Sequence, residues 1–209
     1  MLSGVATVAP RSEGLVVRLP PEKWFTDADV LAFQRLNPDL RLEQEADGTL
    51  IVMAPAGAMT GAMNLEISGQ LRDWARRDGS GIAFDSSAGF RVPPHGALLS
   101  PDASWVARRR WDALPDVERR RFPRLCPDFV LELRSPSDDL EMVHAKLREY
   151  QQAGAHLGWL LDPETRTVWV YRAGGAQPEE LPDPATLAGD PVLTGFRLDV
   201  RAIWEAAGL

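Results

Sequence analysis

The chain has 209 residues, of which 44% are hydrophobic and 25% are charged, and its formal net charge at pH 7 is −7. This composition is typical of a globular protein with a buried core and argues against a largely disordered chain. No stretch reaches the ~18 apolar residues that a membrane-spanning helix needs, and the first residues lack the pattern of a secretory signal. We therefore expect a cytoplasmic protein with no membrane partner, in which any contact with a polyanion depends on a local basic patch.

The length and the even composition predict a single domain over residues 19–209, preceded by a flexible N-terminal segment over residues 1–18. Cys126 is the single cysteine, and it lies between Leu125 and Pro127 at the start of an apolar run. Because it has no intramolecular disulfide partner, we interpret it as a buried structural thiol.

The spacing of apolar residues and turn formers predicts a mixture of helices and strands. Thr26 is a suitable N-cap for a first helix, which ends at Asn37 because a proline follows. Asp47 and Gly48 then form the turn of a β-hairpin. The elements predicted after the hairpin are a long helix over residues 62–75, strands over 81–84, 89–92 and 103–106, an arginine-rich excursion over 108–124, an apolar strand over 129–133, a helix that is capped by Ser137 or Asp138 and runs to Gln152, and strands over 157–161 and 167–171. Together they predict an α/β fold with a mixed central β-sheet flanked by helices, plus an N-terminal helix and β-hairpin.

Glu132 is the one acid in the apolar strand Phe129–Leu133. An ionised carboxylate in a buried strand is costly unless a cation or a metal holds it. Strand alternation places Val130, Glu132 and Arg134 on one face. The sequence leaves two interpretations open, an ion pair between Glu132 and Arg134 or a role for Glu132 as a metal ligand.

Asp102 follows a serine and a proline, and an acid in such a turn is usually solvated. If its strand neighbours that of Glu132, the two carboxylates form a pair of hard oxygen ligands suited to Mg²⁺ or Mn²⁺. Such a metal, with open positions for water and a phosphate oxygen, is what hydrolysis of a phosphodiester requires.

Two further residues are candidates for this site. Lys146 lies on the helix after the Glu132 strand, and Lys23 is the only other lysine in the chain. A lysine near a metal can orient or deprotonate a water, although an exposed lysine is the commoner case. Glu66 on the long helix is suited to reach the metal through water, although a solvated helix acid is the simpler interpretation.

Several motifs occur in the order and spacing of the bacterial putative restriction endonuclease family, a branch of the PD-(D/E)XK nuclease superfamily, which the chain resembles from Phe25 to Trp204. These motifs are Asn64-Leu65-Glu66-Ile67, the segments 100–106 and 127–138, Lys146-x-x-x-Tyr150, Gly154-Ala155 and the segment 158–163, which reads GWLLDP. The resemblance implies a restriction-endonuclease-like fold and Mg²⁺-dependent hydrolysis of DNA phosphodiester bonds, with Mn²⁺ as a possible substitute.

The resemblance also implies roles for individual residues. Asp102, Glu132 and the Leu133 carbonyl are expected to bind the metal, Lys146 to position the attacking water, and Glu66 to support the metal or the water. The superfamily places its lysine two residues after the strand acid, where this chain has an arginine, so the resemblance assigns that role to Lys146. Many relatives also carry a histidine near the start of the long helix, where this chain reads TGAMN over residues 60–64.

Other interpretations remain open at the level of sequence. The chain is expected to act on DNA and to be a possible homodimer, but a nuclease-like fold can also serve as a non-catalytic module for nucleic-acid binding or protein assembly. The excursion over residues 108–124 is either a DNA-facing patch or a surface for a protein partner. Ser135 and Ser137 are expected to shape the strand exit. His144 lies near Lys146 on its helix, and a surface role is favoured over a contact with the site, whereas His95 and His156 lack metal-ligand spacing.

Overall fold

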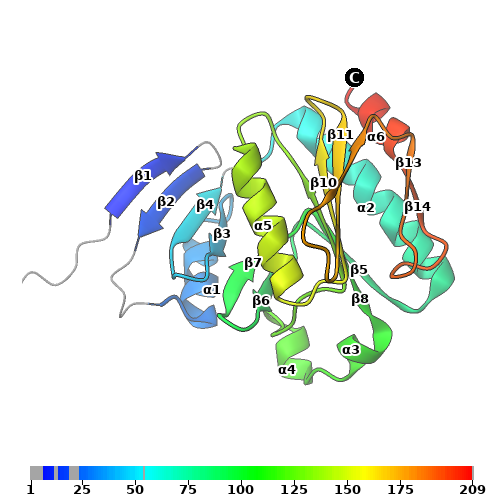
Figure 1. Ribbon diagram of the computed structural model, residues 1–209. Helices are drawn as coiled ribbons and strands as arrows, with labels where there is room; N and C mark the ends of the chain where they lie inside the picture. Colours follow the sequence, from blue (N-terminus) through cyan, green and yellow to red (C-terminus); the bar gives the residue numbers. More distant parts are fainter. Residues whose placement is uncertain (1–6, 12–13, 19–23, 54, 209) are drawn as a thin grey trace, which may run out of the picture.

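The computed structural model describes residues 7–11, 14–18, 24–53 and 55–208, and its centre consists of two six-stranded β-sheets (Figure 1). The first sheet is antiparallel throughout and contains, in spatial order, β1 (Thr7–Arg11), β2 (Gly14–Arg18), β4 (Leu50–Met53), β3 (Arg41–Gln44), β7 (Ala97–Leu99) and β6 (Phe90–Val92). Two of these strands, β1 and β2, lie within the segment expected to be flexible, and residues 1–6 and 12–13 of that segment lie outside the described residues.

The second sheet is mixed, as the sequence predicts. It contains, in spatial order, β12 (Glu179–Pro182), β11 (Thr167–Arg172), β10 (Leu157–Asp162), β9 (Phe129–Leu133), β8 (Ala103–Ala107) and β5 (Gly81–Asp85). Only β9 and β10 pair in parallel, and α5 (Leu140–Gln152) makes the crossover that a parallel pair requires. The strand of Glu132 therefore lies in the interior of this sheet, beside β8.

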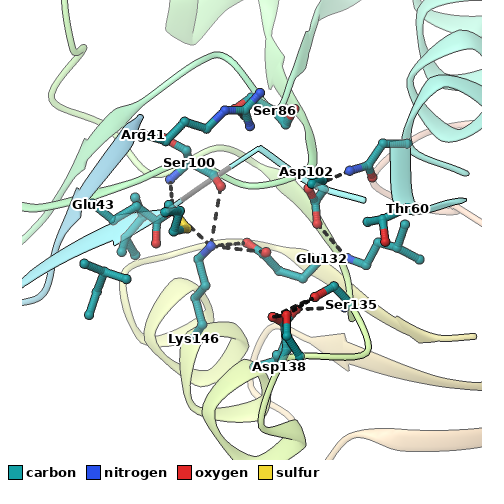
Figure 2. Close-up of a pocket in the computed structure, with 18 of the residues that line it drawn as sticks. Arg41, Glu43, Thr60, Ser86, Ser100, Asp102, Glu132, Ser135, Asp138 and Lys146 are labelled. Carbon is teal, nitrogen blue, oxygen red and sulfur yellow. Dashed lines mark hydrogen bonds and ion pairs between the residues drawn. The ribbon is translucent and has the colours of Figure 1, made fainter. Parts of the chain in front are cut away.

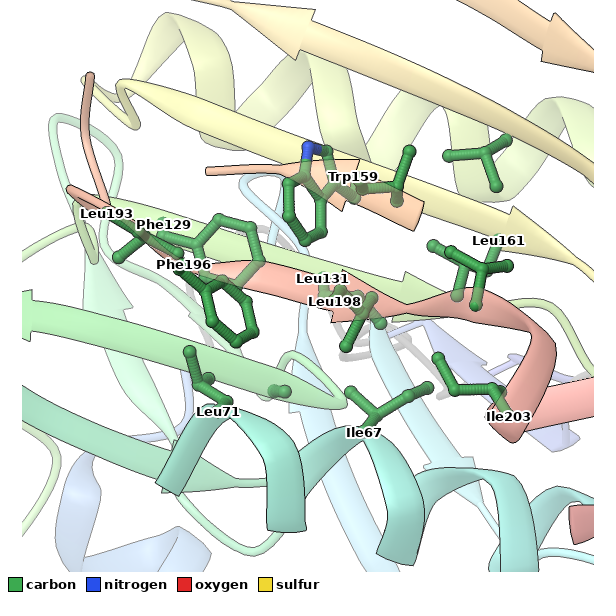
Figure 3. Close-up of a cluster of buried hydrophobic side chains, with 14 of the residues drawn as sticks. Ile67, Leu71, Phe129, Leu131, Trp159, Leu161, Leu193, Phe196, Leu198 and Ile203 are labelled. Carbon is green, nitrogen blue, oxygen red and sulfur yellow. The ribbon is translucent and has the colours of Figure 1, made fainter. Parts of the chain in front are cut away.

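Helices cover both faces of the second sheet (Figure 1). On one face, Leu147 and Tyr150 of α5 pack in the same cluster as Val130 of β9. On the other face, α2 (Ala58–Asp78) and α6 (Val200–Ala206) pack against Leu131 and its neighbours (Figure 3). A small sheet of β13 (Thr186–Ala188) and β14 (Arg197–Asp199) lies beside these two helices. The predicted alternation of β9 is confirmed, because Phe129, Leu131 and Leu133 belong to the α2 side.

The first helix and the first hairpin follow the prediction closely. α1 (Asp27–Leu36) begins after Thr26, whose hydroxyl accepts a hydrogen bond from the Asp29 backbone while the Asp29 carboxylate accepts from Thr26. This reciprocal capping box satisfies backbone donors at the helix start. Strands β3 and β4 form the predicted hairpin around Gly48, whose φ of +89° is a conformation that glycine adopts without strain.

Other boundaries differ from the prediction for local reasons. The N-cap of α5 is Asp139, whose carboxylate accepts from two backbone N–H groups at the helix start, whereas Asp138 instead accepts from the backbone and hydroxyl of Ser135. α2 starts at residue 58, four residues earlier than predicted. The arginine-rich excursion forms two short helices, α3 (Arg108–Asp112) and α4 (Asp116–Arg119). The strands over residues 81–84 and 89–92 do form, but they belong to different sheets, so the turn between them passes from one sheet to the other.

Cys126 is buried, as predicted, and burial raises the pKa of its thiol to about 12. A thiol with such a pKa carries almost no thiolate at neutral pH and is chemically inert. Among the described residues, no helix combines the length and the apolar character that crossing a bilayer requires.

Arg91 connects the first sheet to α1. Its guanidinium donates to the carboxylate of Asp27 and to the side-chain oxygen of Gln44, each over 2.8 Å, and to the backbone carbonyls of Phe25 and Gly96. Arg91 is only 6% exposed, so these hydrogen bonds replace almost all of its hydration. The hydrogen bond from Arg91 thereby fixes Gln44, which follows Glu43 in β3.

We predict that Arg91→Met lowers the free energy of unfolding by at least about 2 kcal/mol, because it leaves buried acceptors without their donor. Denaturant unfolding curves measure this change. Arg35→Met is the matched control, since Arg35 is an exposed arginine of the neighbouring helix and its loss is expected to cost less than about 0.5 kcal/mol. Equal losses in the two variants would contradict the assignment.

Candidate functional site

A cleft of about 1090 Å³ is lined by residues from both six-stranded sheets and from α2 and α5. Nine acidic and two basic residues are among the described residues that line it, and the basic ones are Arg41 and Lys146. Asp102 and Glu132 lie in this cleft with Lys146, so the structure brings together three of the four side chains that the sequence selects (Figure 2).

Lys146 is the cation that contacts Glu132. Its ammonium nitrogen lies 3.0 Å from Oε1 and 3.1 Å from Oε2 of Glu132, and 3.0 Å from Oε1 of Glu43. It also donates to the Ser100 carbonyl over 3.4 Å. Glu43 belongs to the first sheet and Glu132 to the second, so the side chain of Lys146 connects the two sheets from α5 (Figure 2).

An ion pair between Glu132 and Arg134, the simpler sequence interpretation, is wrong. Arg134 lies beyond the last residue of β9, and its guanidinium contacts the carboxylates of Asp162 at 3.1 Å and Glu164 at 2.7 Å. These acids lie at the end of β10 and in the turn after it. Arg134 therefore pairs with acids at the end of β10, and Lys146 is the cation that pairs with Glu132.

Asp102 lies directly before β8 and is bound to the end of β9. Its Oδ2 accepts a hydrogen bond from the Leu133 backbone N–H over 2.9 Å, and its Oδ1 accepts from the side-chain amide of Asn64 over 3.0 Å. Antiparallel pairing of Ala103 with Leu131 sets this register. The carboxylate of Asp102 thus contacts the backbone of the residue that follows Glu132.

The charges in the cleft perturb one another. Burial raises the pKa of Glu132 well above its usual range, because the attraction of Lys146 only partly opposes burial and the repulsion of Asp102 and Glu43 adds to it. Burial also raises the pKa of Asp102, against hydrogen bonds from Leu133 and Asn64 and the charge of Lys146. Burial alone would lower the pKa of Lys146, but its carboxylate neighbours outweigh burial and raise it. Lys146 is therefore an ammonium group at neutral pH and acts as a hydrogen-bond donor.

Glu43 and Asn64 are residues of the site that the sequence reasoning does not select. Glu43 is buried, and its Oε1 accepts a short 2.6 Å hydrogen bond from the Ser100 backbone in addition to the contact with Lys146. The sequence does contain a signal for Glu43, because it is an acid in a predicted strand, as Glu132 is. Charged and apolar residues alternate in this hairpin, however, which is typical of a strand with one solvated face.

The structure does not bring Glu66 to this cluster. Its carboxylate accepts from the side-chain amide of Gln70 over 3.0 Å, and Gln70 also hydrogen-bonds the backbone of Asp199 in the C-terminal part of the chain. Other residues of α2, among them Asn64 and Ser68, line the cleft instead.

The remaining candidates lie around the cleft or away from it. The hydroxyl of Ser135 donates to Asp138 and lies 2.8 Å from that of Ser137, so the serines shape the exit from β9. His144 contacts the Tyr171 hydroxyl and the ring of Trp169 and does not line the cleft.

The cleft residues fit a hard divalent cation better than a soft one. Asp102 and Glu132 offer carboxylate oxygens, and each oxygen of Asp102 accepts one hydrogen bond, which leaves it a further lone pair. Oε1 of Glu132 is buried, and the Lys146 ammonium lies 3.0 Å from it. Within that part of the chain, no three His, Cys, Asp or Glu side chains are grouped to hold a metal. Two carboxylate ligands suit an ion such as Mg²⁺, which keeps several of its waters.

A family model described as "Putative restriction endonuclease", named Uma2, matches residues 27–201. The chain belongs to this family. The match spans most of the described chain, from the first residue of α1 into α6, and includes every residue of the cleft that contacts Lys146. No curated protein matches the chain.

A solved structure with a similar fold is that of a putative nuclease belonging to DUF820 from Anabaena variabilis ATCC 29413. The two chains are 19% identical, and the match has a TM-score of 0.68 and covers 85% of this chain and 98% of the other. At this level of identity the likeness shows the fold, and it confirms the predicted nuclease-like α/β architecture.

We predict that Mn²⁺ or Mg²⁺ raises the melting temperature of the chain and that Asp102→Asn removes this effect. A ligand present at ten times its dissociation constant stabilises a protein by about 1.4 kcal/mol, which corresponds to a shift of about 4 °C for a chain of this size. Thermal melts with and without metal measure the shift in each variant against its own metal-free value.

Glu66→Gln is the matched control for this measurement, because it neutralises an acid that lies on α2 outside the cleft lining. This variant is expected to keep the full shift. A shift that survives in Asp102→Asn would place the metal elsewhere.

Proposed function

We propose that the chain is a metal-dependent endonuclease that hydrolyses DNA phosphodiester bonds, with Mg²⁺ as its cofactor and Mn²⁺ as a substitute. The observation that carries this proposal is the convergence of Asp102 and Glu132 from adjacent strands in one cleft, with the ammonium of Lys146 on Glu132. Membership of a family described as restriction endonucleases and the nuclease-like fold support it.

In this proposal, Asp102, Glu132 and the Leu133 carbonyl would hold the cation. When bound, a divalent cation neutralises charge on the scissile phosphate and lowers the pKa of a water molecule. The hydrogen bond from the Leu133 N–H to Asp102 supports the assignment, since it fixes the backbone of Leu133 beside both carboxylates.

Lys146 positions the attacking water in this proposal and does not act as its base. Its raised pKa keeps the proton on the ammonium group at neutral pH, so Lys146 can donate a hydrogen bond but cannot accept a proton. Glu43 serves this role indirectly, because its carboxylate holds the ammonium group at a fixed place between the two sheets. Such orientation of a reactant is a large part of catalysis in many enzymes.

Asn64 takes the supporting position that sequence reasoning gives to Glu66. Its side-chain amide donates to Oδ1 of Asp102 and so fixes the orientation of that carboxylate, which is the usual task of a residue behind a metal ligand. Our proposal gives Glu66 no contact with the cation, because its carboxylate pairs with Gln70.

The charge of the cleft supports dependence on a cation. Nine acidic residues line a cleft with two basic ones, and a phosphodiester brings further negative charge. Repulsion of this size opposes the approach of DNA unless cations offset it. A homodimer and a cytoplasmic location stay predictions.

We predict that the wild type nicks or cuts plasmid DNA with Mg²⁺ or Mn²⁺ and not with EDTA. Glu132→Gln, Asp102→Asn and Lys146→Met are each expected to lower the rate at least about 100-fold, the usual scale for loss of one catalytic group. Gel assays of initial rates measure this, after circular dichroism has shown that each variant is folded. Glu66→Gln is the control that retains activity.

Two results would count against the proposal. Cleavage by Lys146→Met at the wild-type rate would remove the positioning role. Absence of cleavage with every divalent metal, in a wild type that still binds DNA, would favour the alternative of a non-catalytic binding module.

A further inference from the structure

A second, smaller pocket of about 170 Å³ lies beside the cleft, across the turn between β5 and β6. Asp85 and Ser86 of this turn line the cleft, and Ser87 in the same turn lines the small pocket. The two sites therefore lie on either side of this turn. Phe84, Trp111, Phe122, Arg119 and Arg121 provide the aromatic and cationic parts of the small pocket.

The aromatic rings in the pocket lining are tilted relative to one another, with 52° between the planes of Phe84 and Trp111. Phe84 and Trp111 lie with ring centroids 5.0 Å apart, and Phe84 packs edge-on against the buried Phe90 at 5.4 Å. Phe84, Trp111 and Phe122 are each partly exposed. A cavity of about 150 Å³ holds one benzene ring. The pocket thus has room for a single base and not for a base pair.

The charge beside the pocket is opposite to that of the cleft. Residues 108–124 contain seven arginines and three acids, a net charge of +4 in a chain whose total is −7. Arg121 is exposed and makes no ion pair among the described residues, whereas Arg119 pairs with Asp116. Guanidinium groups suit phosphate because they donate several hydrogen bonds in a fixed plane.

Hydrogen bonds and an ion pair fix two of the segments that carry lining residues of the pocket. The carboxylate of Asp128 accepts from Arg110 over 2.8 Å and from the Ala107 backbone over 2.8 Å, which fixes the start of α3 on the second sheet. In the turn, the Asp85 carboxylate accepts from the Ser87 backbone over 3.0 Å. A preformed site binds its ligand with little cost of ordering.

We propose that this pocket binds one nucleotide of a single-stranded segment of the DNA, next to the cleft in which the bond is cut. The base stacks against Trp111 and Phe122, and Arg119 and Arg121 contact its phosphate. Stacking on aromatic side chains and cationic contacts to the backbone are the two components of single-strand binding. This inference rests on the proposed function, because the pocket would supply the cationic contacts with DNA that the acidic cleft lacks.

The test is binding of a short fluorescent oligo-thymidine to the full chain, measured by anisotropy at several salt concentrations without divalent metal. The double variant Arg119→Gln/Arg121→Gln is expected to bind about tenfold more weakly. The slope of its plot of log affinity against log salt concentration is expected to be less steep by up to about 1.4, which is roughly 0.7 for each phosphate contact. The matched control is Arg76→Gln/Arg77→Gln, which removes two exposed arginines from the end of α2 and is expected to bind like the wild type.

A second variant separates stacking from charge. Phe122→Leu is expected to weaken binding about fivefold or more while the salt dependence stays that of the wild type. An abasic oligomer of the same length is expected to bind the wild type about as weakly as oligo-thymidine binds Phe122→Leu. Thermal melts verify that each variant is folded.

The proposal is overturned if the two double variants bind equally, if the abasic oligomer binds as tightly as oligo-thymidine, or if polyglutamate of the same length competes equally well. It is also overturned if the wild type binds no oligonucleotide. Because binding is measured without metal, its failure is distinct from that of the proposed function. If the chain binds through the pocket but never cleaves, only the proposed nuclease activity is refuted. If it cleaves while the Arg119→Gln/Arg121→Gln variant binds normally, only the nucleotide pocket is refuted.

Discussion

The ammonium group of Lys146 is the interaction on which the arrangement of the cleft depends. It lies between Glu43 of the first sheet and Glu132 of the second, at 3.0 Å from a carboxylate oxygen of each. Both carboxylates are buried, and without a shared cation their repulsion and their desolvation would oppose the packing of one sheet beside the other. The same two carboxylates keep Lys146 protonated, so these two ion pairs both connect the two sheets and set the chemistry that the lysine can perform.

The molecule separates its charges in space. Acidic residues dominate the cleft, and the +4 segment over residues 108–124 lies beyond the turn that borders it. In the proposed function, the basic segment would attract a polyanion and the acidic cleft would repel it, unless a cation held by Asp102 and Glu132 offset the local charge. In our proposals, this division lets a chain with an acidic total charge approach DNA, and it links the proposed catalysis to the proposed nucleotide pocket.

Much of the fold and part of the site could be predicted from local pattern. The alternation of β9 placed Glu132 on the face opposite Leu131, and the capping residues located α1. Contacts between distant segments could not be predicted in this way. Arg134 continues the alternation of β9, but the strand ends before it and the guanidinium contacts Asp162. Glu66 and Asn64 are two residues apart on α2 and so point about 200° apart around its axis, which is why one lines the cleft and the other does not. Glu43 becomes part of the site only because the side chain of Lys146, on α5, reaches it from the second sheet.

The most direct test of the account is a crystal structure with Mn²⁺, whose anomalous scattering locates the ion without reference to activity. The account predicts one Mn²⁺ within about 2.3 Å of a carboxylate oxygen of Asp102 and of Glu132, with the Lys146 ammonium still in contact with Glu132. Two carboxylates more than about 8 Å apart could not share one metal whose oxygen bonds are near 2.1 Å. A structure that shows such a separation, or that places Mn²⁺ away from both carboxylates, would contradict the proposal.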